Sequence, residues 1–486
     1  MKTVLIAALV STGLAVPVPA WSATPPGPAW SACPASAAVD PRQECGTVSV
    51  PVDYARPGGP RLDLAISRLR TAAPGLRRGV LVLIPGGPGN SGVNRPSAYV
   101  GKLPQSVLDR YDLVSFDPRG VGASALVSCG LQPADITQTR IMPWPGAGGD
   151  ITPTVDWSRR AAAACADNGG PVYDSISSRN EARDLDAIRQ ALGERRISYW
   201  GVSYGTYVGA VYATMFAAHT DRVVLDSNDD PDPELVERGW AANYAIGVED
   251  RFPDFAAWAA ARDGQYHLGV DPAAVRGTYL RLADSLDREP LPWTGADPPV
   301  LDGNTLRSNL LNGLYSDSRF PQLAGLMSAA LAGGPLPPTG AAPEAALQNT
   351  FAVLNATICH DVRWPRDIRS YAAGVSANRQ AFPLTAGMPV NIYTCAFSPA
   401  PVEPPVRVTP DGPSNVLLVQ NLRDPATPYR KALNLRTAFG DRARMVAVDA
   451  GGHGSYLENG NPCGDAWVTA FLTDGTRPAH DVTCPA

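Results

Sequence analysis

The stretch Ile197–Phe216, ISYWGVSYGTYVGAVYATMF, sets a short apolar run, a Gly-x-Ser-x-Gly pentapeptide and a helix-like segment in immediate succession. A strand that turns sharply into a helix at the central serine forms a nucleophile elbow, which exposes the serine hydroxyl above a parallel sheet. Backbone passes close to the residues two before and two after this serine, so both must be small, and Gly201 and Gly205 meet that need. The pentapeptide alone is a weak signal, but its flanking patterns make Ser203 the predicted nucleophile.

Apolar runs of the kind that fill a parallel sheet recur on both sides of this elbow. They are Gly79–Pro85 (GVLVLIP), 112–116, 222–225, 415–419 and 444–448, and an alternating pattern over 62–66 predicts a half-exposed strand. Helical patterns lie between them, most clearly over 180–192, where Ser178 and Glu181 predict a capping box. This alternation predicts an α/β fold with a mostly parallel, doubly wound sheet.

The buried-strand runs stop between about Pro231 and Pro413, where helical segments take over, one of them capped by Asp271 before Pro272. A Gly/Pro-rich loop over 333–340 interrupts these segments, and a proline-rich stretch over 399–413 ends them. We therefore predict a signal peptide over 1–20, the first part of an α/β core over 21–230, an inserted helical cap with a proline-rich return over 231–413, and the C-terminal part of the core over 414–486.

The N-terminus has the layout of a secretory signal peptide: Lys2, an apolar run over 4–16, and then small residues. The alternative, a membrane anchor, requires a run of about 20 apolar residues, and this run is shorter. Cleavage is expected after Ala20, with Ala23 as second choice. We therefore expect an exported, extracellular protein with no membrane contact once the signal is removed.

An even number of cysteines in an exported chain favours disulfides. A zinc site is the alternative, but no CxxC pair supports it. Eight cysteines allow 105 connectivities, and we expect pairing in sequence order. The expected pairs are Cys33–Cys45, Cys129–Cys165, Cys359–Cys395 and Cys463–Cys484.

The composition narrows the class of protein. The chain has 486 residues, 44% of them hydrophobic and 18% charged, which suits a large globular protein. Its formal net charge of −5 argues against a nucleic-acid binder, because affinity for phosphate backbones requires a basic surface.

A serine nucleophile requires a histidine base and a carboxylate that orients the histidine. Of the five histidines, only His453 lies in a glycine-rich loop, GGHG, after a late apolar run. In this fold the acid precedes the histidine along the chain, and Asp424 follows the run over 415–419 directly. Asp226, on an earlier run, is the alternative acid.

Acyl transfer also requires N–H donors for the oxyanion. We predict the backbone N–H groups of Tyr204, directly after the nucleophile, and of Gly87, in the PGGPG loop after the first buried run. A plain tight turn is the alternative interpretation of that loop. In the segment Asp117-Pro118-Arg119-Gly120 we expect an ion pair that braces the loop.

Together, PGGPGNSG, FDPRGVGAS, YWGVSYGTYVGAVYA, QNLRDPATP and GGHG resemble the exported tripeptidyl aminopeptidases, α/β-hydrolase serine peptidases related to prolyl aminopeptidase. The resemblance extends from the CGTVSVPVDYARPGG segment to Cys484. It implies an α/β-hydrolase fold with a cap, and Ser203, Asp424 and His453 as nucleophile, acid and base.

The resemblance also implies cleavage from a free N-terminus, with acidic residues near the cap that bind the α-ammonium group. The family's usual Gly-Val after the strand is replaced here by Ser-Asn-Asp-Asp, and solvated acidic loops are the alternative interpretation. The candidate ammonium partners are Asp229, Asp230, Glu249 and Asp250.

The leading hypothesis is a secreted serine exopeptidase that works through an acyl-enzyme, without metal or organic cofactor. A secreted carboxylesterase uses the same elbow and oxyanion donors and is the second hypothesis. A binding protein that has lost catalysis is the third. We expect a monomer that binds peptides and not nucleic acid, with activity that falls below about pH 6 because His453 must be neutral.

Overall fold

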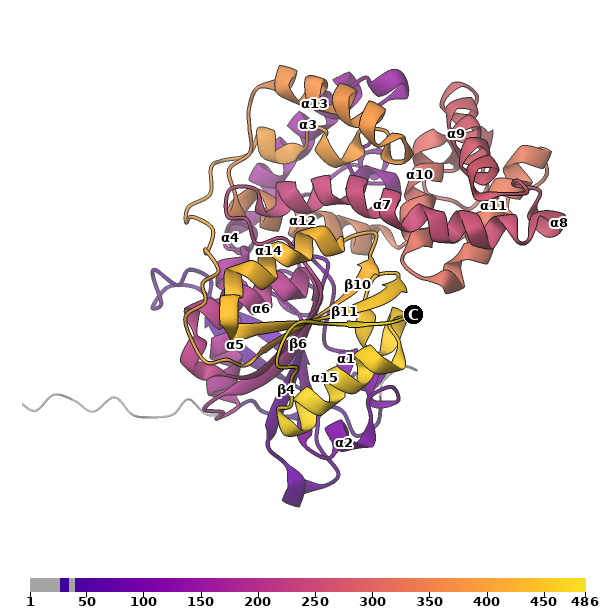
Figure 1. Cartoon of the computed structure of the whole chain (residues 1–486). Coiled ribbons are helices and arrows are strands. Elements are labelled where there is room, and N and C mark those ends of the chain that lie inside the picture. Colours follow the sequence, from indigo (N-terminus) through magenta and orange to yellow (C-terminus); the bar gives the residue numbers. More distant parts are fainter. Residues whose placement is uncertain (1–26, 35–39) are drawn as a thin grey trace, which may run out of the picture.

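The structure is a computed structural model, and it describes residues 27–34 and 40–486. Its central feature is a ten-stranded sheet with strand order β1-β2-β3-β5-β4-β6-β7-β10-β11-β12 (Figure 1). The predicted signal peptide, with cleavage after Ala20 or Ala23, lies outside the described residues. The strands are β1 Ser31–Ala32, β2 Glu44–Pro51, β3 Arg61–Leu69, β4 Gly79–Ile84, β5 Tyr111–Phe116, β6 Ile197–Ser203, β7 Thr220–Asn228, β10 Val416–Arg423, β11 Ala443–Gly451 and β12 Val482–Cys484.

Every apolar run predicted from the sequence lies within, or overlaps, one of these strands. From β5 to β12 all neighbours in the sheet are parallel, whereas β1, β2 and β3 pair antiparallel at one edge. The carboxyl ends of parallel strands meet at one edge of a sheet, and ligands of open α/β sheets bind there. This is the predicted α/β-hydrolase fold, with the elbow at the carboxyl end of the central strand β6.

Helices cover both faces of the sheet (Figure 1). One face packs against α5 Ser178–Ala191, α6 Tyr204–Met215 and α14 Tyr429–Phe439, which contribute Leu185, Val208 and Leu435 to its apolar core. The other face packs against α2 Gln105–Leu108 and α15 Pro462–Asp474, with α1 Arg95–Val100 at its side. The predicted doubly wound arrangement is therefore confirmed.

The capping box predicted at the start of α5 is wrong by one residue. The side chain of Ser177, not Ser178, accepts a hydrogen bond from the backbone N–H of Asn180 and caps the helix. Glu181 is buried and accepts a hydrogen bond from the Tyr204 hydroxyl, so it cannot complete the box. The predicted cap at Asp271 is confirmed, since its side chain accepts from the N–H of Ala274.

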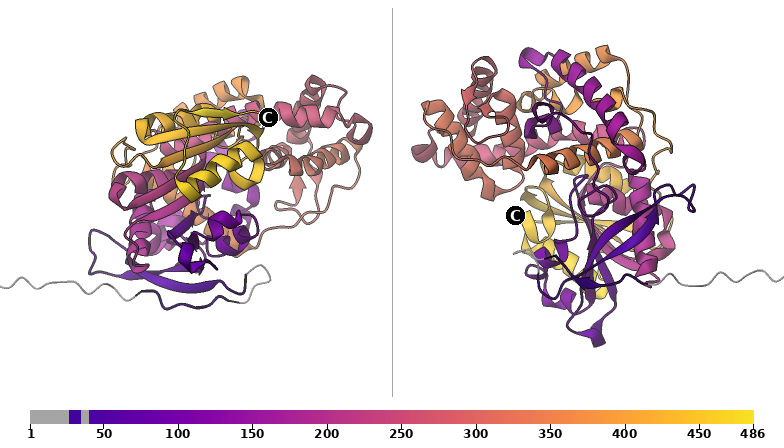
Figure 2. Two further views of the ribbon diagram at one scale, coloured as in Figure 1. Left: turned by 60° about the horizontal axis from the view of Figure 1, so that its bottom comes forward. Right: turned by 180° about the vertical axis from the view of Figure 1, so that it is seen from behind.

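The region between β7 and β10 is mainly helical and forms a cap over the carboxyl edge of the sheet (Figures 1 and 2). One apolar cluster joins α7, α9, α10 and α11, and a second joins α12 to the segment around α3. The predicted division of the chain placed this α3 segment in the core part, 21–230. The cap elements are α7 Val236–Ala260, α8 Asp263–Tyr266, α9 Pro272–Arg288, β8 Leu291–Pro292, β9 Val300–Leu301, α10 Gly303–Leu314, α11 Phe320–Ala332, α12 Glu344–Asp361 and α13 Ile368–Ala381, with α3 Thr152–Asn168 and α4 Gly170–Asp174 packed beside them.

All four predicted disulfides are present, paired in sequence order. Cys129–Cys165 ties α3 to the loop after β5, and Cys359–Cys395 closes the α12 half of the cap. Across residues 27–34 and 40–486, no helix is long and apolar enough to span a bilayer.

Candidate active site

The turn from β6 into α6 has the backbone of a nucleophile elbow. Ser203 has φ 58° and ψ −129°, a strained conformation for a residue with a side chain. A Cβ at Gly201 would lie 2.7 Å from the carbonyl carbon of Gly205, and one at Gly205 would lie 2.9 Å from the oxygens of Ile84 and Pro85. Both positions therefore require glycine, as the sequence predicts.

Asp424 and His453 lie next to one another at the carboxyl ends of β10 and β11. Both carboxylate oxygens of Asp424 are 3.0 Å from Nδ1 of His453. The carboxylate is fully buried and also accepts hydrogen bonds from the backbone N–H groups of Ala426 and Thr427 and from the Thr427 hydroxyl. This arrangement puts a proton on Nδ1 and leaves Nε2 of His453 free to act as a base.

Asp226, the alternative acid, is bound elsewhere. Its two oxygens accept the backbone N–H groups of Ser455 at 2.7 Å and Tyr456 at 2.9 Å, two and three residues after His453. Asp226 therefore holds the loop that carries His453 and does not contact the imidazole through a hydrogen bond.

The two residues predicted as oxyanion donors lie in the loop after β4 and at the start of α6. Ile84 pairs with Gly201 in the parallel register of β4 and β6, so the PGGPG loop begins beside the elbow. A Cβ at Gly86 would lie 3.3 Å from Cβ of Ser203. Tyr204 is the first residue of α6, where backbone N–H groups have no partner within the helix. Gly87 has φ 118°, a conformation that favours glycine.

The side chain of Tyr204 is fixed by a buried network. Its hydroxyl donates to Oε2 of Glu181 at 2.9 Å and lies 3.0 Å from the Ser178 hydroxyl. Burial raises the pKa of Glu181 to about 8, although the hydrogen bond from Tyr204 opposes this. The side chain of Tyr204, directly after the elbow, is therefore fixed by two side chains of α5.

Comparison with known proteins finds relatives that match most of the chain. Residues 383–484 match the family described as TAP-like protein. The chain is 35% identical to a tripeptidyl aminopeptidase of Streptomyces lividans over 91% of its length and 83% of the relative's. It is 31% identical to serine protease Hip1 of Mycobacterium bovis, with 90% and 87% covered, and 32% identical to carboxylesterase B of Mycobacterium tuberculosis, with 90% and 86% covered.

The chain belongs to the tripeptidyl aminopeptidase family. It is thus a serine hydrolase with the α/β-hydrolase fold, and the resemblance seen in the sequence motifs is confirmed.

The prediction of an ion pair within the Asp117–Gly120 loop is wrong. Arg119 pairs instead with Asp184 of α5, and both side chains are buried. Asp117 accepts hydrogen bonds from the backbone N–H groups of Gly92, Val93 and Ala123. The loop is braced by these N–H groups and by the Ser91 hydroxyl, whereas the guanidinium of Arg119 binds the helix layer.

Three of the four candidate ammonium partners are bound by other side chains. Asp230 accepts from Asn434 at 2.9 Å, Glu249 pairs with Arg276, and Asp250 pairs with Arg430. Asp229 is buried and forms no ion pair with any described residue, and its carboxyl interacts electrostatically with both His453 and Asp424. Burial raises the pKa of Asp229 to about 8; the charge of Asp424 adds to this, and His453 opposes it.

Two tyrosines of the cap belong to the surroundings of His453 and were not predicted from the sequence. The ring of Tyr315, just after α10, packs edge-on against His453 with centroids 4.8 Å apart, and its hydroxyl lies 3.1 Å from that of Tyr244 in α7. Neither tyrosine belongs to a motif, so only the packing of the cap on the core reveals them.

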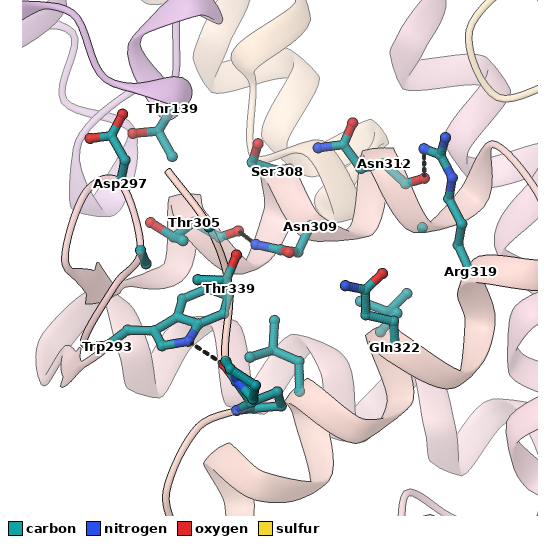
Figure 3. A pocket seen from close by; sticks show the side chains of 17 residues that line it. Thr139, Trp293, Asp297, Thr305, Ser308, Asn309, Asn312, Arg319, Gln322 and Thr339 are labelled. Carbon is teal, nitrogen blue, oxygen red and sulfur yellow. Dashed lines mark hydrogen bonds between the residues drawn. The ribbon is translucent and has the colours of Figure 1, made fainter. Parts of the chain in front are cut away.

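A separate cavity of about 370 Å³ lies inside the cap between α10 and α11 (Figure 3). Its walls are mostly polar and include Trp293, Thr305, Asn309 and Gln322. None of the predicted site residues lines it, so it is distinct from the site around Ser203.

The pKa of His453 leads to a testable pH dependence for this hydrolase. Burial alone would lower this pKa, but the charge and hydrogen bond of Asp424, with smaller contributions from Asp229 and Asp226, raise it above its ordinary 6.5. Because the base must be neutral, kcat/KM should fall as the pH drops through a value above 6.5, higher than the pH 6 expected from sequence. A pH–rate profile between pH 5 and 9 measures this, and a rate unchanged down to pH 4 would contradict the role of His453.

Proposed function

We propose that this protein is an exported serine exopeptidase that removes short peptides, tripeptides among them, from free N-termini through a Ser203–His453–Asp424 triad. The observation that carries the proposal is the pairing of Asp424 with Nδ1 of His453 at the same sheet edge as the strained Ser203. The names of the relatives support the choice of a peptide substrate.

In the proposed reaction, Oγ of Ser203 attacks the carbonyl carbon of the scissile amide while Nε2 of His453 takes its proton. The N–H groups of Gly87 and Tyr204 donate to the oxyanion. His453 then protonates the leaving amine, which departs as the shortened peptide, and a water activated by His453 hydrolyses the acyl-enzyme. The positive charge that forms on His453 is stabilised by Asp424.

Asp229 is proposed to bind the substrate's α-ammonium group. It is the one candidate among Asp229, Asp230, Glu249 and Asp250 that combines burial, an electrostatic interaction with His453 and no ion pair within the described chain. A cation beside this carboxyl favours its ionised form, so a substrate with a free N-terminus lowers the raised pKa of Asp229 as it binds.

The deciding assay uses peptide anilides of one to three residues, each with a free and with an acetylated N-terminus, beside aryl esters. Cleavage of the free peptides alone supports an N-terminal exopeptidase, and the longest efficient substrate gives the number of residues released. Equal cleavage of acetylated peptides would overturn the exopeptidase proposal.

Replacement of Asp229 by Asn is expected to raise KM for free peptides by about 10–100-fold, because a charge-assisted contact to the ammonium is lost. Activity on aryl esters should change little. Asp230→Asn is the matched control, since the Asp230 carboxylate is already bound by Asn434. An equal effect of both variants, or none of Asp229→Asn, would remove Asp229 from the ammonium site.

A carboxylesterase is the second candidate function, favoured by the relative named carboxylesterase B. The elbow and the oxyanion donors serve an ester as well as an amide. Turnover of esters without turnover of any free peptide would select this function.

The proposed location is extracellular. It is supported by the N-terminal pattern of residues 1–20 and by four disulfides, which persist in oxidising compartments. The proposed working form is a monomer with a peptide as its only partner. The mass of the protein in the culture medium tests cleavage after Ala20 or Ala23, and light scattering tests the monomer.

A further inference from the structure

One face of the cap helix α7 packs directly on the loops that carry the proposed acid and base. Tyr244, Gly247, Arg251 and Asp254 are spaced by three, four and three residues, so they share one side of the helix. Together with Tyr315 after α10 they form a contact surface that we call the cap clamp.

The first contact of the cap clamp is with the acid loop. A Cβ at Gly247 would lie 2.8 Å from the carbonyl oxygen of Asp424 and would collide with the carbonyl of Pro425. The helix backbone therefore rests on the backbone of the acid itself. Any side chain at position 247 must push α7 and this loop apart.

The second contact is a chain of ion pairs. Arg251, whose side chain is 2% exposed, binds Asp254 and Asp317 and donates to the carbonyl of Leu314, the residue before Tyr315. Asp254 also accepts from Nε of Arg423 at 2.8 Å, and Arg423 directly precedes Asp424. The carboxylate of Asp254 in α7 thus binds Arg423, at the end of β10 directly before Asp424. Through Arg251 it also links this strand end to α10.

The third contact is with the base loop. The backbone N–H of His453 donates to the carbonyl oxygen of Tyr315 at 2.9 Å, and the Tyr315 ring packs edge-on against the imidazole. A Cβ at Gly452 would lie 2.8 Å from the same carbonyl oxygen. The position of His453 therefore depends on the cap as well as on Asp226 and Asp424 of the core.

We propose that the cap clamp positions Asp424 and His453 for catalysis, so that the core is fully active only when the cap is docked in this arrangement. The inference rests on the proposed triad. The residues of the cap clamp are positioning residues, since they act through Asp424 and His453. The hydrogen bond between Asp424 and His453 requires both loops at fixed separation, and the cap contacts both.

The test is Gly247→Ala, with Gly325→Ala as the matched control. Gly325 lies within α11, and a Cβ there would meet no atom within 4 Å. Displacement of a catalytic group by about 1 Å costs about 100-fold, so we expect kcat of Gly247→Ala to fall about 100-fold with KM little changed. The control should keep wild-type kcat.

A second variant covers the case in which Gly247→Ala does not fold. Asp254 is partly exposed, and Asp254→Asn removes the charge that Arg423 and Arg251 share. We expect about a tenfold loss of kcat, recovered in part by Asp254→Glu. The pKa of the acid limb in the pH–kcat/KM profile should also move, because the geometry between His453 and Asp424 changes; a purely structural role would leave it in place.

A folded Gly247→Ala or Asp254→Asn protein with wild-type kcat and an unchanged acid limb would overturn the cap clamp. A wrong assignment of the triad is distinguished by other variants. In that case Ser203→Ala and His453→Ala would both remain active in the same assay.

Discussion

Replacement of Ser203 by Ala is expected to lower kcat for peptide anilides by a factor on the order of 10⁵–10⁶. The reason is that the acyl-enzyme cannot form without Oγ, whereas the oxyanion donors of Gly87 and Tyr204 and the binding site remain. The residual rate should still exceed that of the uncatalysed reaction, since those donors stabilise the transition state on their own.

This variant should fold normally. The positive φ of Ser203 is imposed by the close packing of Gly201 and Gly205, and an alanine has the same Cβ as a serine at this position. Thermal unfolding of the variant should therefore match that of the wild type. Ser106→Ala, at an exposed position of α2, serves as the control and should keep full activity. More than about 1% of wild-type kcat in Ser203→Ala would mean that another group is the nucleophile.

Asp424→Asn is expected to lower kcat by about 10⁴-fold. An asparagine keeps the shape of the side chain but can turn its amide toward Nδ1, which puts the imidazole proton on Nε2 and removes the base. The lost carboxylate charge should also lower the pKa of His453, because Asp424 is the largest of the groups that raise it. The acid limb of the pH–kcat/KM profile should therefore move to lower pH.

Asp226→Asn is the matched comparison, since both carboxyls are fully buried. Asparagine can still accept from one of the two N–H groups of Ser455 and Tyr456, so the main cost is in stability, about 1–3 kcal/mol for the unpaired donor. We expect a lower Tm and a kcat within about tenfold of the wild type. Loss of kcat in Asp226→Asn without loss in Asp424→Asn would exchange the two assignments.

Much of the framework could be predicted because its signals are local. The elbow is readable since Gly201, Ser203 and Gly205 impose their own backbone conformation within five residues. Continuous apolar runs such as 79–84 predict central strands because both faces of a parallel sheet are buried. For the disulfides, pairing in sequence order is one expectation among 105 possible connectivities, and the structure confirms it.

Other features could not be predicted because they depend on distant partners. Arg119 pairs with Asp184 and not with its near neighbour Asp117, and Ser177, not Ser178, caps α5. The α3 segment packs with α12 across nearly 200 positions of chain. The sequence could not single out Asp229 among the four candidate ammonium partners. The arginines and the amide that bind the other three lie elsewhere in the fold.

The sequence by itself determined the α/β-hydrolase sheet, the strained turn at Ser203 and the nearness of Asp424 and His453 to the ends of successive strands. These follow from residue size, hydrophobic period and chain order, which act over short stretches. Only the tertiary structure decided which carboxylate holds the imidazole, which of the four candidate ammonium partners forms no ion pair with a described residue, and that Gly247 and Tyr315 of the cap rest on the acid and base loops. Those contacts join residues far apart in the chain, and their distances arise only when the cap and the sheet pack together.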